Sequence, residues 1–302
     1  MTDSGISRSS EYRLSKIVRL FAERAGPSAS SDPKSILKKL LSEMKRAVGW
    51  RTKTPRLEAA QTARGILQTH YTTNGDCDGR LEPIGTSFDC GFKLYLNPSA
   101  PKTRVRFTQA HEICHTFFYQ FVPEVKFRPH PEDAQEERLC NFGAAELLMP
   151  ERSLRQDAKT LPRSIDSLFF LAESYCVSIE AMMSRLRSLQ LWNCELYFWH
   201  YEAEGGFVLD RVTGSRYLPW KWSDTAVPMR AWRNGRHSGH SYLEHGIDRE
   251  CKYFKSISFD ARREGATLLV LSGVAGSRVP PPLWQVIQDE GATCRAGGPD
   301  SG

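Results

Sequence analysis

The chain has 302 residues, of which 40% are hydrophobic and 25% are charged, so one or two globular domains with a packed core are expected. No apolar run approaches the roughly 18–20 residues of a membrane-spanning helix, and the opening MTDSGISRSSEYRLSK lacks the apolar stretch of a secretory signal. These features predict a soluble protein of the cytoplasm.

The net charge of +6 originates in the N-terminal segment, where residues 1–57 contain 13 Lys or Arg against 5 Asp or Glu. Two amphipathic helices are predicted there, one around 14–21 and one around 36–48, joined by a linker at 26–33. We expect the first helix to be loosely attached. The basic excess is either a solvated helix face or a surface that attracts nucleic acid.

Mixed structure follows. A helix is predicted around Glu58–Tyr71, and a turn-rich stretch at 74–79 precedes a strand at 91–97. Next, a helix begins near Thr103 and contains VRFTQAHEICHTFFYQF. After a proline break, a further helix is predicted at about Glu132–Leu148, ending at Met149-Pro150.

Two helical patterns within 164–190, joined by a short turn at Tyr175-Cys176-Val177, predict a helix-turn-helix-like pair. Such a pair could bring Arg185 and Arg187 into a DNA groove, although its apolar residues favour packing on the protein core. After Leu191 the short aromatic and β-branched segments ELYFWHY, GGFVLDRV, KYFKSISF and ATLLVLSGV predict a mainly β module.

The motif His111-Glu112-Ile113-Cys114-His115 is HExxH. Residues i and i+4 lie one turn apart on one side of a helix, so His111 and His115 can bind one metal ion. Glu112 is placed to take a proton from the water that Zn²⁺ activates, without binding the ion itself. The sequence therefore predicts a zinc site with Glu112 as the catalytic carboxylate.

A catalytic zinc ion needs a third protein ligand, which we expect from the helix that contains Glu137 and Asn141. Glu137 is the favoured ligand, and the amide oxygen of Asn141 can accept the free N–H of a zinc-bound histidine. Glu136 and Glu146 compete for the ligand role. Glu136 points about 100° away from the Glu137 side of the helix.

RFTQAHEICH followed by ERLCNFGAAELLMP resembles the ImmA/IrrE family of metallopeptidases over about residues 85–190. The resemblance implies an α+β, zincin-like (minimal gluzincin) domain that cleaves a helix-turn-helix repressor and relieves repression after stress or phage induction. By the matching positions, His111, His115 and Glu137 would bind zinc and Glu112 would be the catalyst.

The chain departs from the family pattern at two positions. Many members have Gly where this chain has Cys114, and a larger residue is more common where it has Gly143. We expect Cys114 to crowd the packing between the two helices and Gly143 to make the third-ligand helix less rigid.

Weaker signals lie elsewhere. The loose cluster of His237, His240, Glu244 and His245 is interpreted as exposed loop residues, with a second metal site as the alternative. The eight cysteines form no CxxC pair and are interpreted as small buried hydrophobes of a reducing compartment, although Cys77 and Cys90 could pair.

These patterns predict three parts: a basic N-terminal helix and linker (1–33), a zinc metallopeptidase domain with a helix-turn-helix-like end (34–191), and a mainly β module (192–302). By analogy with some members of the resembled family, that module is expected to be a sensor of the GAF or PAS kind. The alternative to a peptidase is a DNA-binding or protein-binding regulator that uses the same scaffold with little proteolysis.

Overall fold

The computed structural model describes residues 14–26, 32–54, 56–73, 78–85, 90–122, 133–202, 206–213, 221–222, 231–246 and 252–272. Packing divides the chain into two compact units, which are described separately: Met1–Pro150 with Tyr175–Val177, and Glu151–Ser174 with Ser178–Gly302. Both units contain helices and a sheet, so the chain is an α+β protein, as the sequence predicts. The three predicted domains, 1–33, 34–191 and 192–302, remain predictions. The two compact units describe how the chain packs and do not define domain boundaries.

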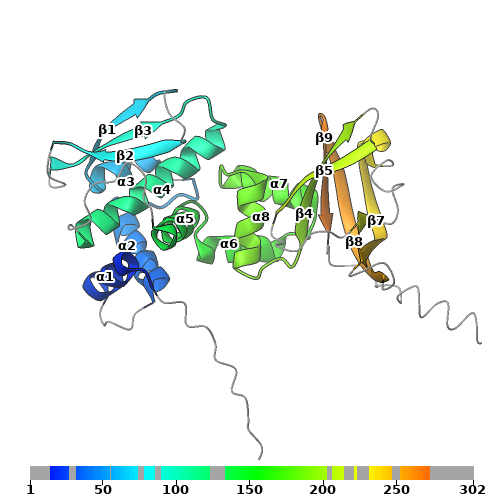
Figure 1. Cartoon of the computed structure of the whole chain (residues 1–302), viewed down its shortest axis with the longest axis horizontal. Coiled ribbons are helices and arrows are strands. Elements are labelled where there is room, and N and C mark those ends of the chain that lie inside the picture. Colours follow the sequence, from blue (N-terminus) through cyan, green and yellow to red (C-terminus); the bar gives the residue numbers. More distant parts are fainter. Residues whose placement is uncertain are drawn as a thin grey trace, which may run out of the picture. The chain divides into compact units, whose positions relative to one another are not determined.

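Within its described residues, the first unit combines helices with a small sheet (Figure 1). The helices are α1 (Lys16–Ala25), α2 (Pro33–Ala47), α3 (Leu57–Ala63), α4 (Lys102–Phe121) and α5 (Ala134–Leu148). The strands are β1 (Ile66–Tyr71), β2 (Gly79–Pro83) and β3 (Phe92–Leu96), in the order β1-β3-β2. The central strand β3 pairs parallel with β1 and antiparallel with β2.

Helix α4 is the centre of this unit. It contacts β2 and β3 of the sheet as well as α5, and Figure 1 shows it between the two. Its residues from Ile113 to Tyr119 are all buried, so its C-terminal half is covered on every side. Helix α5 begins at Asp133, whose carboxylate accepts hydrogen bonds from the amides of Gln135 and Glu136. Burial therefore positions α4, and the cap at Asp133 fixes the start of α5, which faces it.

Two expectations from the sequence are wrong in this unit. The helix predicted over Glu58–Tyr71 ends at Ala63, because Gly65 adopts a positive φ of 73° and the following residues form β1. The first helix, α1, is not loosely attached. Its Phe21 is fully buried and stacks on Phe118 of α4, with ring centroids 4.5 Å apart.

The described residues of the second unit combine short helices with a larger sheet. The helices are α6 (Glu151–Thr160), α7 (Ile165–Ser174) and α8 (Ile179–Ser188). The strands are β4 (Glu195–Glu202), β5 (Gly206–Thr213), β6 (Lys221–Trp222), β7 (Arg236–Gly246), β8 (Lys252–Glu264) and β9 (Thr267–Ser272). They form an antiparallel sheet in the order β5-β4-β9-β8-β7-β6, which agrees with the mainly β module predicted after residue 191.

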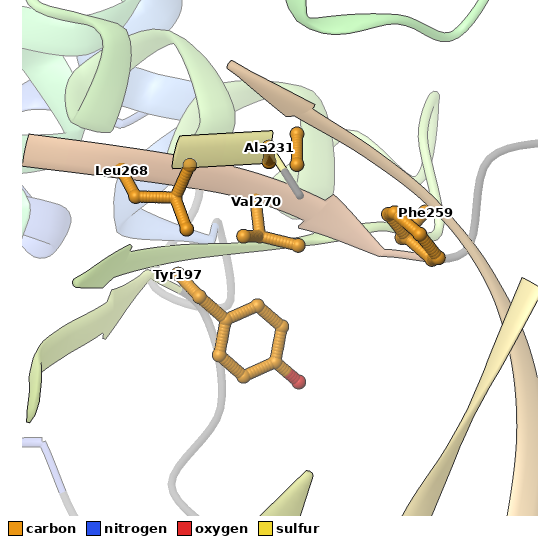
Figure 2. Close-up of a cluster of buried hydrophobic side chains, with 6 residues drawn as sticks. Tyr197, Ala231, Phe259, Leu268 and Val270 are labelled. Carbon is orange, nitrogen blue, oxygen red and sulfur yellow. The ribbon is translucent and has the colours of Figure 1, made fainter. Parts of the chain in front are cut away.

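The two faces of this sheet carry different side chains. Helix α7 contacts β8 and β9, and α8 contacts β4 and β5, so the helices lie over one face. Neighbouring residues of a strand point to opposite faces. A cluster of buried hydrophobic side chains on the sheet contains Tyr197 of β4 with Leu268 and Val270 of β9 (Figure 2). Ala231, Phe259 and Ala261 complete that cluster.

Asp260 of β8 joins the sheet to α7. Its carboxylate is 3% exposed and accepts a hydrogen bond of 2.9 Å from the amide of Ile165, at the start of α7. It also lies 3.3 Å from the guanidinium of Arg236. A buried carboxylate at a helix N-terminus satisfies an amide that the helix itself leaves unpaired.

Replacing Asp260 with Ala leaves the buried Ile165 amide without an acceptor. We expect Asp260→Ala to lower the free energy of unfolding by about 1–3 kcal/mol, measured by urea unfolding followed by tryptophan fluorescence. Asp260→Asn keeps an acceptor oxygen and should lose less. Equal unfolding midpoints for the Ala variant and the wild type would contradict this role.

Candidate metal centre

Helices α4 and α5 bring the predicted site residues together. His111, Glu112 and His115 lie on α4, and Glu137 and Asn141 lie on α5. The Nε2 atoms of the two histidines are 3.0 Å apart. Glu137 places one carboxylate oxygen 3.3 Å from Nε2 of His111 and the other 3.2 Å from Nε2 of His115. Of the described residues, His111, His115 and Glu137 are the group whose ligand atoms lie within 4.8 Å of one another.

These separations fit a small tetrahedral ion. Ligand atoms at about 2.0–2.1 Å from a tetrahedral metal are roughly 3.3 Å apart. Here the two Nε2 atoms are 3.0 Å apart, and each lies 3.2–3.3 Å from one of the two carboxylate oxygens of Glu137. Two imidazole nitrogens and a carboxylate oxygen are also the donors that zinc accepts, and three protein ligands leave a position open. The residues present therefore fit a catalytic metal centre.

The outer nitrogens of the two histidines are also occupied. Nδ1 of His111 lies 3.0 Å from Oδ1 of Asn141, and Nδ1 of His115 lies 2.9 Å from Oε1 of Glu136. Both partners are acceptors, so each Nδ1 carries the hydrogen and each neutral imidazole directs the lone pair of its Nε2 inward. With a metal ion bound, two lone pairs and the carboxylate of Glu137 would face it; without one, a proton on an Nε2 atom takes the place of the positive charge.

The ionisation of the site residues reflects this pairing of charges. Burial acts to raise the pKa of Glu137, but hydrogen bonds from both histidines outweigh it and hold this pKa well below its usual value. Burial likewise acts to lower the pKa of His115, whereas Cys140, Glu136 and Glu137 raise it well above its usual value. Without a metal ion, a protonated imidazole is thus the positive charge that the cluster contains.

Glu112 is in a different situation. It is 7% exposed, and burial raises its pKa above the ordinary value, opposed by the positive charge of His115 and then of His111. A carboxylate with a raised pKa holds a proton more readily than a surface carboxylate does. The environment of Glu112 therefore favours proton transfer.

The two departures from the family pattern compensate each other. A Cβ atom on Gly143 would lie 2.6 Å from Sγ of Cys114 and 2.8 Å from Cδ2 of Leu37, both closer than real contacts allow. The missing side chain at 143 is what makes room for the thiol between α4 and α5. The expected crowding by Cys114 is therefore wrong.

Three cysteines of the described chain are buried and two are exposed. Cys114, Cys140 and Cys194 are buried, whereas Cys90 and Cys176 are exposed, so the interpretation as buried hydrophobes holds for the first three. Burial raises the pKa of Cys140 to about 11 and that of Cys114 well above its usual value, which makes both poor nucleophiles. Cys77, the possible partner of Cys90, lies outside the described residues.

Sequence reasoning missed the place of Glu136. It was weighed as a competing ligand, whereas the structure places its carboxylate on Nδ1 of His115. The available signal was its position beside Glu137, rotated by about 100°, which lets neighbouring acids reach different atoms of one site. Glu146, the other competitor, is buried on α5 and does not belong to the cluster of ligand atoms.

The interpretation of the C-terminal histidines as loop residues is wrong. They belong to strand β7, which spans Arg236–Gly246. Along a strand, residues three apart are separated by about 10 Å and residues eight apart by about 26 Å. His237, His240 and His245 are therefore spread along β7. The ring of His237 packs against Phe259, with centroids 5.6 Å apart.

Comparison with known proteins identifies part of the chain. Residues 84–187 match the family model described as the IrrE N-terminal-like domain, Peptidase_M78. Among curated proteins, no sequence matches. A solved structure described as a Mycobacterium tuberculosis transcriptional regulator is similar at 15% identity and a TM-score of 0.44, covering 85% of this chain and 79% of that chain. A similarity of that size defines neither fold nor function.

A double-mutant cycle tests the pairing of Cys114 with Gly143. Gly143→Ala introduces a clash of about 1–3 kcal/mol, offset by about 1 kcal/mol because alanine favours a helix. In a Cys114→Ala background the clash with sulfur disappears, while that with Leu37 remains. We expect a coupling energy of at least about 0.5 kcal/mol from urea unfolding of the four proteins. Additive effects would show that the two positions are independent.

A second prediction concerns the buried charge of Glu112 in the metal-free protein. Its folded pKa is raised above the ordinary 4.5, so stability falls as the pH rises from that value to the folded pKa and then stays lower. Glu112→Gln lacks this penalty. In chelator, we expect the variant to melt at a higher temperature than the wild type near pH 7, with the difference vanishing near pH 4. A difference that grows towards acid pH would contradict the sign.

Proposed function

We propose that this chain, whose residues 84–187 belong to the ImmA/IrrE family, is a zinc-dependent endopeptidase with a zincin-like peptidase domain. The observation that carries the proposal is the convergence of His111, His115 and Glu137, with the buried carboxylate of Glu112 beside them. A site that only stabilises the fold needs no general base next to its ligands. The presence of Glu112 therefore favours catalysis over a structural role.

The residues of the site would divide the work of peptide hydrolysis. The chemistry that zinc supplies when bound is polarisation of a carbonyl group and activation of water, whose pKa falls towards about 7. His111, His115 and Glu137 would hold the ion, and Asn141 would orient His111 through its Nδ1. Glu112 would take a proton from the attacking water and pass it to the leaving amine.

The position of the edge strand β2 favours a polypeptide as the substrate. It pairs with β3 on one side, and on its other side the described residues include no partner strand. A Cβ atom on its Gly79 would clash with the side chain of Thr108 on α4, so this end of the strand rests directly on the helix. Thr108 lies one turn before His111. An extended peptide that adds to β2 would therefore run past the metal centre, and such strand addition is a common mode of peptide recognition.

The substrate class follows from the family resemblance. We propose that the protein cleaves a helix-turn-helix transcriptional repressor and so relieves repression in a stress response or a response of phage or mobile elements. We further propose that it acts in the cytoplasm, where cysteines such as Cys114 and Cys140 remain free. Among the described residues, no helix is long and apolar enough to cross a membrane.

The alternative function is regulation by binding, with little proteolysis. The environments of two arginines of α8 argue against DNA binding through α7 and α8. Arg185 is 4% exposed, and Arg187 contacts the carbonyl of Cys194 and the carboxylate of Glu195. Neither side chain is extended towards solvent as a phosphate contact requires. A protein-binding regulator remains the alternative that only an activity measurement separates from a peptidase.

The proposal predicts zinc-dependent cleavage of a protein. The zinc-loaded chain is incubated with the repressor encoded nearby in its genome, and fragments are followed by electrophoresis and mass spectrometry. We expect cleavage by the wild type, loss in a chelator with recovery on added zinc, and a decrease of at least about 100-fold in Glu112→Gln, because general-base catalysis contributes 10²–10⁴-fold. Glu43→Gln, an exposed carboxylate on α2, is the matched control and should retain full activity.

Binding of the repressor without cleavage, equally by the wild type and by Glu112→Gln, would overturn the peptidase function and favour the regulator. Cleavage that persists in the chelator would overturn the role of the metal.

A further inference from the structure

Glu136 is a buried carboxylate directly beside the proposed metal ligand Glu137. It is 5% exposed, and its Oε1 atom lies 2.9 Å from Nδ1 of His115, in a hydrogen bond that is itself buried. Its backbone amide is held by the carboxylate of Asp133, at 3.1 Å, in the first turn of α5. The same helix start therefore directs two successive acids to two different atoms of one site.

The burial of Glu136 requires a compensating partner. An ionised carboxylate removed from water is costly unless it is paired and hydrogen-bonded. Within the described residues, the structure gives this side chain no Lys or Arg partner, and its ion pair is with His115. The imidazole of His115 is therefore the partner that compensates for the burial of the Glu136 carboxylate.

The two histidines are supported in different ways. His111 donates from Nδ1 to the amide oxygen of Asn141 at 3.0 Å, whereas His115 donates to a carboxylate oxygen of Glu136 at 2.9 Å. Hydrogen bonds to ionised acceptors are roughly twice as strong as those between neutral groups. A carboxylate on the outer nitrogen also makes the inner nitrogen of the ring a better donor to a metal. His115 is thus the better-supported ligand.

We propose that Glu136 is a positioning residue of the metal centre, which fixes His115 with its Nδ1 hydrogen outward and makes it the stronger of the two histidine ligands. This inference rests on the proposed zinc site and adds to it a residue that binds neither metal nor substrate. Its carboxylate contacts the site at Nδ1 of His115, so its loss should weaken metal binding.

Metal affinity provides the test. Zinc affinity of the full-length chain is measured by competition with a chromophoric chelator for the wild type, Glu136→Gln, Glu136→Ala and Asn141→Ala. Removing a partner of a ligating histidine costs 10–100-fold in affinity. We expect about tenfold weaker binding for Glu136→Gln, which keeps an acceptor but loses the charge, and close to 100-fold for Glu136→Ala. Asn141→Ala should lose less than Glu136→Ala.

The matched control is Glu146→Gln. Glu146 is on the same helix and is 6% exposed, comparable to Glu136, but it lies outside the cluster of ligand atoms. This control should bind zinc as the wild type does. The visible absorption bands of the Co²⁺-loaded protein give a second measurement, because they report the ligand field. They should shift in Glu136→Gln and stay unchanged in Glu146→Gln, whereas a purely structural contribution of Glu136 would change only the unfolding midpoint.

Wild-type zinc affinity and an unchanged Co²⁺ spectrum in Glu136→Gln would overturn the positioning role while leaving the proposed metal centre intact. A greater loss in Asn141→Ala than in Glu136→Ala would overturn the ranking of the two histidines. Failure of the wild type itself to bind zinc would overturn the metal centre, and this inference with it.

Discussion

The close approach of α4 to α5 is the constraint on which the candidate site depends. The thiol of Cys114 occupies the space that a side chain at Gly143 would fill, so the glycine permits the close approach of the two helices at this point. At that separation Glu137 reaches both inner nitrogens of the histidine pair. A wider spacing would take the carboxylate out of reach, because a glutamate side chain spans only a few ångströms. Assembly of the site therefore depends on the packing between α4 and α5.

The buried charge of Glu112 works against the stability of the metal-free protein. Glu112 and Glu136 are buried carboxylates, and Glu137 adds a third negative charge beside the histidine pair. Burying the charge of Glu112 is unfavourable, which its raised pKa expresses, whereas the raised pKa of His115 and the lowered pKa of Glu137 reflect their favourable pairing. The arrangement is understandable if the protein is adapted to a bound ion, since functional sites often sacrifice stability in this way.

Local sequence patterns predicted most elements, and they failed where one residue changed the geometry. The core helix around the motif was predicted within about one residue of its observed bounds, Lys102–Phe121. The helix expected over Glu58–Tyr71 was wrong, because the positive φ of Gly65 ends it and directs the chain into β1. The attachment of α1 could not be predicted either, since the stacking of Phe21 on Phe118 joins residues far apart in the chain.

The sequence by itself determined the donor pair His111 and His115 and the neighbouring acid Glu112, because their spacing is a property of one helix. It also favoured Glu137 over its neighbours, from the side of α5 that it shares with Asn141. Only the tertiary structure decided that Glu136 lies on His115 and that Cys114 is accommodated by Gly143. Both contacts join different helices, and no periodicity along the chain encodes the distance and rotation between two helices.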